Sequence, residues 1–92
     1  MNEAGLRDPK AITFEELGSG YHLFITFGQT HAHSVNGVTF NKDLVAVIRC
    51  SDYAEGRKIA HELFDGVFAT SYGQEQIEKS MCHFPRGMAY AN

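Results

Sequence analysis

The residues best suited to chemistry form one short cluster, Gln29, His31 and His33, just past an alternating strand pattern that begins at Tyr21. If the chain stays extended here, side chains two residues apart project from the same face of a sheet. The two imidazoles would then lie about 6.5–7 Å apart at their Cα atoms. The amide of Gln29 adds a donor and an acceptor. This pattern predicts the floor of a site without specifying a reaction.

Metal binding by His31 and His33 is one of three interpretations of the pair. Zinc or another divalent metal ion would need at least a third ligand. The second interpretation is a site for a small polar or anionic ligand, and the third is a pair of structural or solvated histidines. The residues that could complete a metal site, none at a spacing that forces it there, are His22, Asp43, Cys50, Cys82 and His83.

Two arginines are candidate anion ligands. Proline fixes one backbone dihedral and glycine frees another, so a turn at 84–87 would present Arg86 in a defined direction. A guanidinium held in this way can bind a phosphate or carboxylate through two hydrogen bonds. Arg49 ends an apolar strand and is the other candidate, although it could instead form a salt bridge to Asp52 or Glu55. The alternative for Arg86 is an ordinary turn with a solvated side chain.

No residue pattern specifies catalysis. Cys50 and Cys82 lie far apart, outside any CxxC motif, and are best interpreted as reduced thiols acting as small buried hydrophobes. The sequence contains no glycine-rich phosphate loop, no Ser-His-Asp signature and no carboxylate pair at a telling spacing. It therefore favours a binding protein over an enzyme, and we assign no catalytic residue.

The length and charge of the chain limit the classes of protein to which it can belong. The 92 residues predict a single domain, 1–92, with a loose tail at 1–12. A net charge of −3 and a pI near 5.9 argue against broad binding to nucleic acid, which needs a basic face. Neither a secretory signal nor an apolar run of membrane-spanning length is evident, so we expect a cytoplasmic protein.

The elements that must position these residues follow from local patterns. Asn36-Gly37 is a strong hairpin signal, and Asp52 with Glu55 resembles a helix-capping box. A similar box at Thr13 and Glu16 predicts one helical turn. The expected elements are a turn of helix at 13–17, strands at 21–28 and 44–48, a hairpin within 30–40, a turn at 41–43, a helix at 53–65, a strand at 67–72, a short helix or loop at 74–81 and an edge strand within 83–90.

This order, β-β-β-α-β, predicts an α+β fold: an antiparallel sheet of three to five strands with one main helix packed on one face. The other face would be partly open or covered by a second copy of the chain. A homodimer or higher homo-oligomer is therefore a plausible assembly.

Three segments resemble small accessory proteins of tailed bacteriophages: Phe27-Gly28-Gln29 with His31 and His33, Val35-Asn36-Gly37 leading into Lys42-Asp43, and Phe84-Pro85-Arg86-Gly87. The resemblance covers roughly residues 21–50 and the C-terminal turn. It implies a phage gene product in the bacterial host cytoplasm, of a kind that often counters host defence or redirects host enzymes. It implies no catalytic role.

Three functional hypotheses follow. In the first, Gln29, His31, His33, Arg86 and Arg49 bind a small anionic or nucleotide-like ligand. In the second, the protein inhibits a host protein by docking through an open sheet face or edge strand, anchored by Phe24, Phe40 or Tyr90. In the third, His31 and His33 bind a divalent metal ion. The clustering of polar residues favours the first hypothesis.

Overall fold

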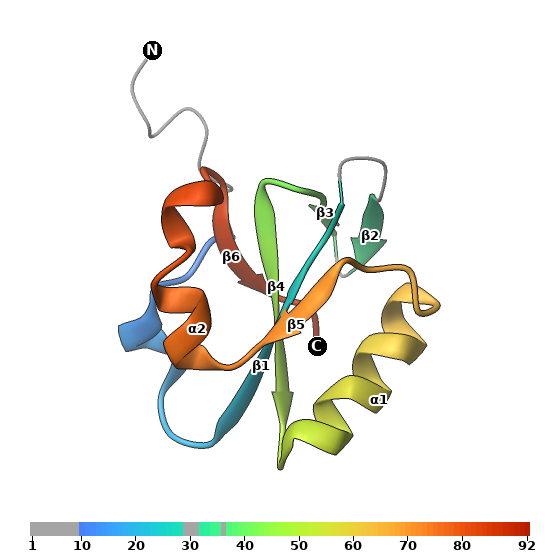
Figure 1. Cartoon of the computed structure of the whole chain (residues 1–92), viewed down its shortest axis with the longest axis horizontal. Helices are drawn as coiled ribbons and strands as arrows, with labels where there is room; N and C mark the ends of the chain where they lie inside the picture. The colour runs from blue at the N-terminus through green and yellow to red at the C-terminus, as the bar shows by residue number, and fades with distance from the viewer. Residues whose placement is uncertain (1–9, 29–31, 36) are drawn as a thin grey trace.

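The computed structural model describes residues 10–28, 32–35 and 37–92, which form an α+β fold around a four-stranded sheet (Figure 1). The strand order is β5-β1-β4-β6, and β2 and β3 pair in a separate hairpin. The elements, in chain order, are η2 (Phe14–Leu17), β1 (Tyr21–Thr26), β2 (His33–Val35), β3 (Val38–Phe40), β4 (Leu44–Cys50), α1 (Tyr53–Phe64), β5 (Thr70–Tyr72), α2 (Gln74–Glu78), η3 (Met81–His83) and β6 (Gly87–Tyr90), where η denotes a 3-10 helix.

The two central strands follow from the apolar pattern. β1 and β4 pair antiparallel, with Tyr21 opposite Cys50. Alternation along β1 sends Leu23 and Ile25 toward α1 and Phe24 toward the opposite face. Every residue of β4 from Leu44 to Ile48 is buried, as expected for a central strand covered on both faces. The strands predicted at 21–28 and 44–48 are present with different ends, because β1 stops at Thr26 and β4 continues to Cys50.

The sheet is mixed rather than antiparallel throughout, which corrects the predicted topology. β5 pairs antiparallel with β1, but β6 pairs parallel with β4, placing Gly87 opposite Leu44. Parallel neighbours need a long crossover connection. The segment from 51 to 86, which contains α1, β5 and α2, provides that crossover. The predicted edge strand near the C-terminus is confirmed, with a direction that sequence did not indicate.

Local signals place both ends of α1 close to the predicted 53–65. Asp52 accepts a hydrogen bond from the backbone N–H of Glu55 (2.8 Å), and the Glu55 carboxylate accepts one from the N–H of Ser51 (2.8 Å). At the other end, Asp65 and Gly66 adopt positive φ angles of 53° and 73°, which terminate the helix. The helix is therefore bounded by its own sequence.

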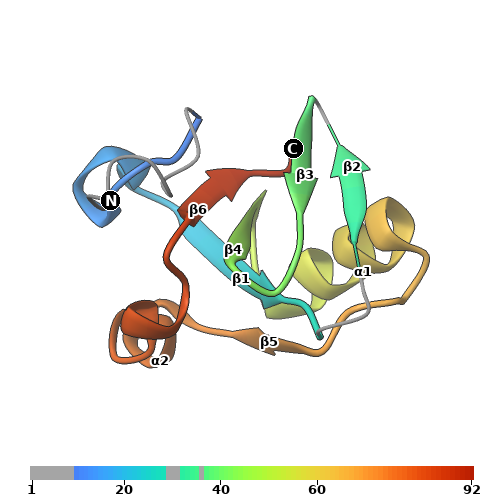
Figure 2. The ribbon, with the colours of Figure 1, turned by 90° about the horizontal axis from the view of Figure 1, so that it is seen from above.

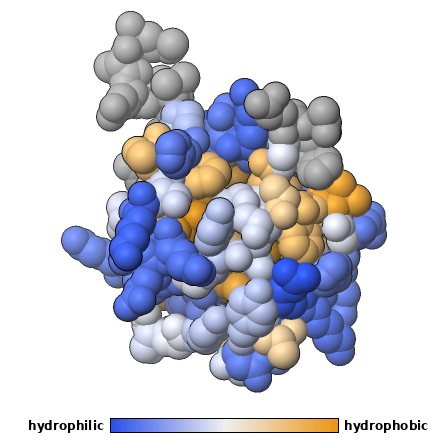
Figure 3. All heavy atoms as spheres, in the orientation of Figure 1, coloured by the Kyte–Doolittle hydropathy of each residue, from blue (hydrophilic) through white to orange (hydrophobic). Residues whose placement is uncertain are grey.

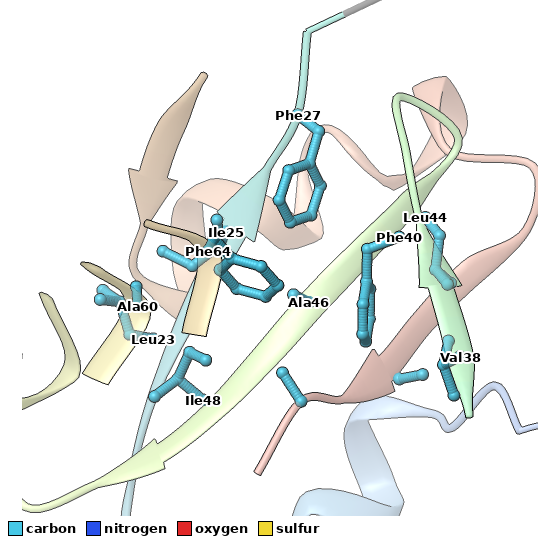
Figure 4. Packing of buried hydrophobic residues seen from close by; sticks show 12 residues of the cluster. Leu23, Ile25, Phe27, Val38, Phe40, Leu44, Ala46, Ile48, Ala60 and Phe64 are labelled. Carbon is cyan, nitrogen blue, oxygen red and sulfur yellow. The ribbon is translucent and has the colours of Figure 1, made fainter. Parts of the chain in front are cut away.

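The β2–β3 hairpin forms as predicted but does not extend the main sheet. Gly37 has a φ of 77°, a conformation that glycine adopts at no steric cost, and Asn36 lies outside the described residues. Val38 and Phe40 are buried, so the hairpin packs its apolar face against the core instead of pairing edge to edge (Figure 4). The predicted turn after it is confirmed by a hydrogen bond from the N–H of Asp43 to Oδ1 of Asn41 (2.9 Å).

Both faces of the sheet carry an apolar core. On the α1 side, Phe27, Phe40 and Phe64 pack around the residues of β1 and β4 (Figure 4). On the other side, η2 and α2 contribute Leu17 and Ile77 to a second cluster. Figure 2 shows α2 away from α1, across the sheet. The expectation of a partly open second face is therefore wrong, because short helices of the same chain cover it.

The remaining segments need smaller corrections. The strand predicted at 67–72 is limited to β5, and the stretch at 74–81 holds the short helix α2 followed by η3. The predicted tail at 1–12 lies mostly outside the described residues, but Ile12 donates a backbone hydrogen bond to Met88 (2.8 Å) and is not loose. Among the described residues, no helix has the length and apolar character needed to span a membrane.

Candidate functional site

His33 anchors the hairpin to the core. Its ring lies 5.7 Å from that of Phe27 and 5.2 Å from that of Phe64, centroid to centroid. Its Nε2 is hydrogen-bonded to the backbone oxygen of Val67 at 2.8 Å. Gln29 and His31 lie outside the described residues, so the predicted row of three polar side chains involves only one described member. In the described structure, His33 stabilises packing between β2, α1 and the segment before β5.

Arg86 connects the start of β6 to the hairpin. Its Nη1 donates to the backbone oxygen of Thr39 (2.8 Å), and its backbone N–H donates to the oxygen of Asp43 (3.0 Å). The guanidinium is therefore held in a defined direction, as the proline–glycine turn predicts. His33 and Arg86 bind carbonyls in different segments, Val67 and Thr39, so each has a structural contact of its own.

Arg49 has an unexpected partner. Its Nε and Nη2 both donate to the backbone oxygen of Asn92, with an Nε–O distance of 2.8 Å, while Oδ1 of Asn92 accepts from the Arg49 backbone N–H (2.8 Å). The guanidinium carbon lies 4.3 Å from the ring centroid of Tyr90. The alternative of a salt bridge to Asp52 or Glu55 is therefore wrong. These contacts use Nε–H and one N–H of Nη2, so the two N–H groups of Nη1 and the second N–H of Nη2 are the donors that they leave to a ligand.

A surface pocket of about 290 Å³, which we call the Arg49 pocket, lies beside this arginine. Its walls come from β3, β4, β6 and the segment before η2. The lining residues are Lys10, Val38, Arg49, Ala89, Tyr90 and Asn92.

The lining of the Arg49 pocket is cationic in a chain that is acidic overall. It includes Lys10 and Arg49, and no aspartate or glutamate is among the six lining residues. The whole chain has 11 acidic side chains against 8 lysines and arginines. Lys10 and Arg49 therefore place two cationic side chains on one small concave surface, beside the aromatic ring of Tyr90.

The described residues contain no group of three or more His, Cys, Asp or Glu side chains that could hold a metal ion. His22, one candidate third ligand, is buried on the opposite face of β1 from Leu23, with its ring 6.4 Å from that of Tyr90. His33 already uses Nε2 for Val67. With His31 outside the described residues, the geometry offers no positive support for a metal centre.

Cys50 and Cys82 do not form a disulfide with each other, as expected, and their environments differ. Cys50 is half-buried under α1, and burial raises the pKa of its thiol, with a further contribution from the negative charge of Glu55. Cys82 is exposed in η3, so its interpretation as a buried hydrophobe is wrong. A raised pKa makes Cys50 a poor nucleophile.

Sequence reasoning found Arg49 but missed Lys10, which it assigned to a loose tail. No local pattern could have paired the two residues, because they are brought together only by the way in which residues 10–12 run beside β6. Tyr90 was singled out only as an interface anchor. It is half-buried and stacks with Arg49.

Comparison with known proteins gives no relative from which a role could be transferred: no family model, curated protein or solved structure matches this chain.

Proposed function

We propose that the protein binds a small anionic, phosphate- or carboxylate-bearing ligand in the Arg49 pocket. The observation that carries this proposal is the pairing of Lys10 and Arg49 on one concave surface of an acidic chain. Arg49 is held in position by Asn92 and by the face of Tyr90. A guanidinium fixed before the ligand arrives loses less side-chain entropy on binding.

The size and chemistry of the pocket narrow the ligand class. A volume of about 290 Å³ equals the space of about ten water molecules in the liquid. It suits a mononucleotide or a smaller phosphorylated or carboxylated compound and is small for a dinucleotide. The Nη1 hydrogens of Arg49 suit the oxygens of a phosphate or carboxylate, and Lys10 adds a second positive charge.

The motif resemblance to tailed-phage accessory proteins supports a biological setting for this activity. In that setting the protein would act in the cytoplasm of the infected bacterium by sequestering an anionic metabolite or nucleotide signal used by the host. No covalent change in the ligand is required, which agrees with the absence of a catalytic pattern in the sequence.

Titration of the full chain with inorganic phosphate and with nucleoside monophosphates, followed by calorimetry and by amide NMR shifts, tests the proposal. We expect saturable binding with shifts at Ala89 and Tyr90. Arg49→Gln and Lys10→Gln should each weaken it by roughly three- to tenfold, as expected for loss of one charge-assisted contact. Lys79→Gln, which removes an exposed cation outside the pocket, should bind like the wild type.

Two results would overturn this proposal. One is the failure of every tested anion to saturate a site on a folded protein. The other is equal weakening by Lys10→Gln and the Lys79→Gln control, which would reflect only net charge. Thermal unfolding of each variant separates lost binding from lost folding, and Lys10→Gln remains informative if Arg49→Gln is unstable.

Direct inhibition of a host protein is the second candidate function, but two of its expected anchors are wrong. Phe24 and Phe40 are both fully buried in the two cores. The edge-strand form of the hypothesis is favoured by a different set of residues around β5.

A further inference from the structure

A polar cluster joins α1 to β5 on the surface of the molecule. The phenolic oxygen of Tyr53 lies 3.0 Å from Oγ of Ser71, and Nη1 of Arg57 donates to the same Oγ at 3.1 Å. Nη2 of Arg57 lies 3.4 Å from Nε2 of His61. Tyr53, Arg57 and His61 are spaced four residues apart, so they line one side of α1. We call Tyr53, Arg57, His61 and Ser71 the Tyr53–Ser71 cluster.

The cation of this cluster is held in a fixed position. The guanidinium carbon of Arg57 lies 5.6 Å from the ring centroid of Phe68, and the ring of His61 lies 5.2 Å from the same ring. Arg57 is thus supported by an aromatic side chain and oriented by the hydroxyl of Ser71. Its remaining N–H donors belong to a side chain whose freedom is already restricted, which lowers the entropic cost of binding a partner.

The cluster lies beside an edge of the main sheet. β5 is the terminal strand of the order β5-β1-β4-β6, and within the described part of the chain it pairs only with β1. It runs across the near side of the molecule between α1 and α2 (Figures 1 and 2). A terminal strand presents backbone N–H and C=O groups on which another extended chain can pair.

The surface around this edge has the composition of a binding surface. Tyr53 is 50% exposed and Val67 is 42% exposed, although both are residues that proteins commonly bury. Figure 3 shows the molecule in the orientation of Figure 1, with β5 toward the viewer. The centre of this face has residues of intermediate polarity, and hydrophilic side chains lie on its flanks. Tyrosine and arginine are the residue types that most often dominate binding energy at interfaces.

We propose that the outer edge of β5 binds an extended, acidic segment of a partner protein by strand addition. In this arrangement the backbone of the segment pairs with Thr70–Tyr72, and one of its carboxylates binds Arg57. Main-chain hydrogen bonds supply affinity in this mode of recognition, and side-chain contacts beside the strand supply specificity.

Charge selects this partner over a second copy of the chain. If two copies of β5 paired about a twofold axis, both Arg57 side chains would lie near that axis on the same face, because each is bonded to the central residue Ser71. Like charges placed opposite each other destabilise strand pairing. An aspartate or glutamate at that position would instead form a charge-assisted hydrogen bond.

Amide NMR of the full chain tests the proposal with two capped peptides of alternating threonine and valine, one with a central glutamate and one with glutamine in its place. We expect shifts centred on Thr70–Tyr72, with the glutamate peptide binding roughly three- to tenfold more tightly. Arg57→Gln should abolish this preference, and Arg57→Lys should retain part of it. Lys58→Gln, an exposed change on the next residue of α1, should leave it intact.

Three outcomes would overturn the proposal: no shifts at millimolar peptide, shifts centred elsewhere, or equal affinity for the two peptides. An unchanged preference in folded Arg57→Gln protein would also exclude Arg57 as the carboxylate ligand. The Arg49 pocket shares no lining residue with the Tyr53–Ser71 cluster. Either proposal can therefore fail without affecting the other.

Discussion

Tyr53 is the residue whose ionisation reports most directly on a local contact. The hydrogen bond with Ser71 is the main cause that lowers the pKa of its phenol below the ordinary value, and the charge of Arg57 contributes as well. Both effects stabilise the phenolate relative to the neutral phenol and therefore lower the pKa of Tyr53.

Removal of the Ser71 hydroxyl should therefore raise the pKa of Tyr53. We expect this in Ser71→Ala, with the ring carbon of Tyr53 followed by NMR during a pH titration. Thr70→Ala is the matched control, because it alters the neighbouring strand residue and leaves the Ser71 hydroxyl in place. An unchanged pKa in Ser71→Ala would show that the hydrogen bond does not persist in solution.

At the scale of the element, the packing of α1 depends on the absence of a side chain at Gly56. This glycine is buried, and a Cβ there would lie 2.8 Å from Sγ of Cys50 and 2.9 Å from Cβ of Leu23. Both distances are shorter than side chains tolerate. The helix can therefore lie close to β1 and β4 only with glycine at this position.

Overpacking in Gly56→Ala should cost about 1–3 kcal/mol of the free energy of unfolding. The roughly 1 kcal/mol that alanine normally adds to helix stability over glycine offsets part of this cost, so we expect a net loss of up to about 2 kcal/mol. Urea unfolding measures the change, and Lys58→Ala provides an exposed control on the same helix. A combined Cys50→Ala and Gly56→Ala protein should recover part of the loss. Increased stability in Gly56→Ala alone would contradict the close packing.

The elements show which features could be predicted from local sequence. The Asp52 cap, the alternating β1 residues and the Gly37 turn are each decided by neighbours within a few positions, and all three appear as predicted. The contacts of the candidate site residues are different. His33 binds a carbonyl 34 residues away, and Arg49 binds Asn92 at a separation of 43. Such partners depend on strand order and packing, which local periodicity does not encode.

At the scale of the whole molecule, the sequence indicated the α+β class but not the arrangement of its layers. The apolar content of β4 predicted that both its faces are covered, yet the covering by η2 and α2 could not be foreseen because each is only one or two turns long. The direction of β6 in the sheet could not be predicted from local sequence either. Its residues fit an edge strand in either direction, and only the crossover through α1, β5 and α2 makes it parallel.

The coverage of both sheet faces leads to a prediction about assembly. Neither face needs a second copy to bury it, because elements of the same chain cover both apolar clusters. The large hydrophobic residues that are exposed in the described part of the chain lie outside both clusters; they are Tyr21, Tyr53 and Val67. We therefore expect a monomer rather than the homo-oligomer suggested by a half-open sheet. Light scattering after size-exclusion chromatography measures this directly. A concentration-independent dimer would require an interface elsewhere, and its loss in Tyr53→Ala would locate it.

The parallel pairing of β6 with β4 also determines when the protein can complete its fold during synthesis. β4 is the most apolar strand, and one of its edges has no partner until Gly87–Tyr90 emerges from the ribosome. Until then the nascent chain presents an exposed apolar strand edge, a feature that promotes aggregation. A released chain truncated before residue 87 should therefore aggregate more readily than the full chain, which light scattering of the two purified proteins measures.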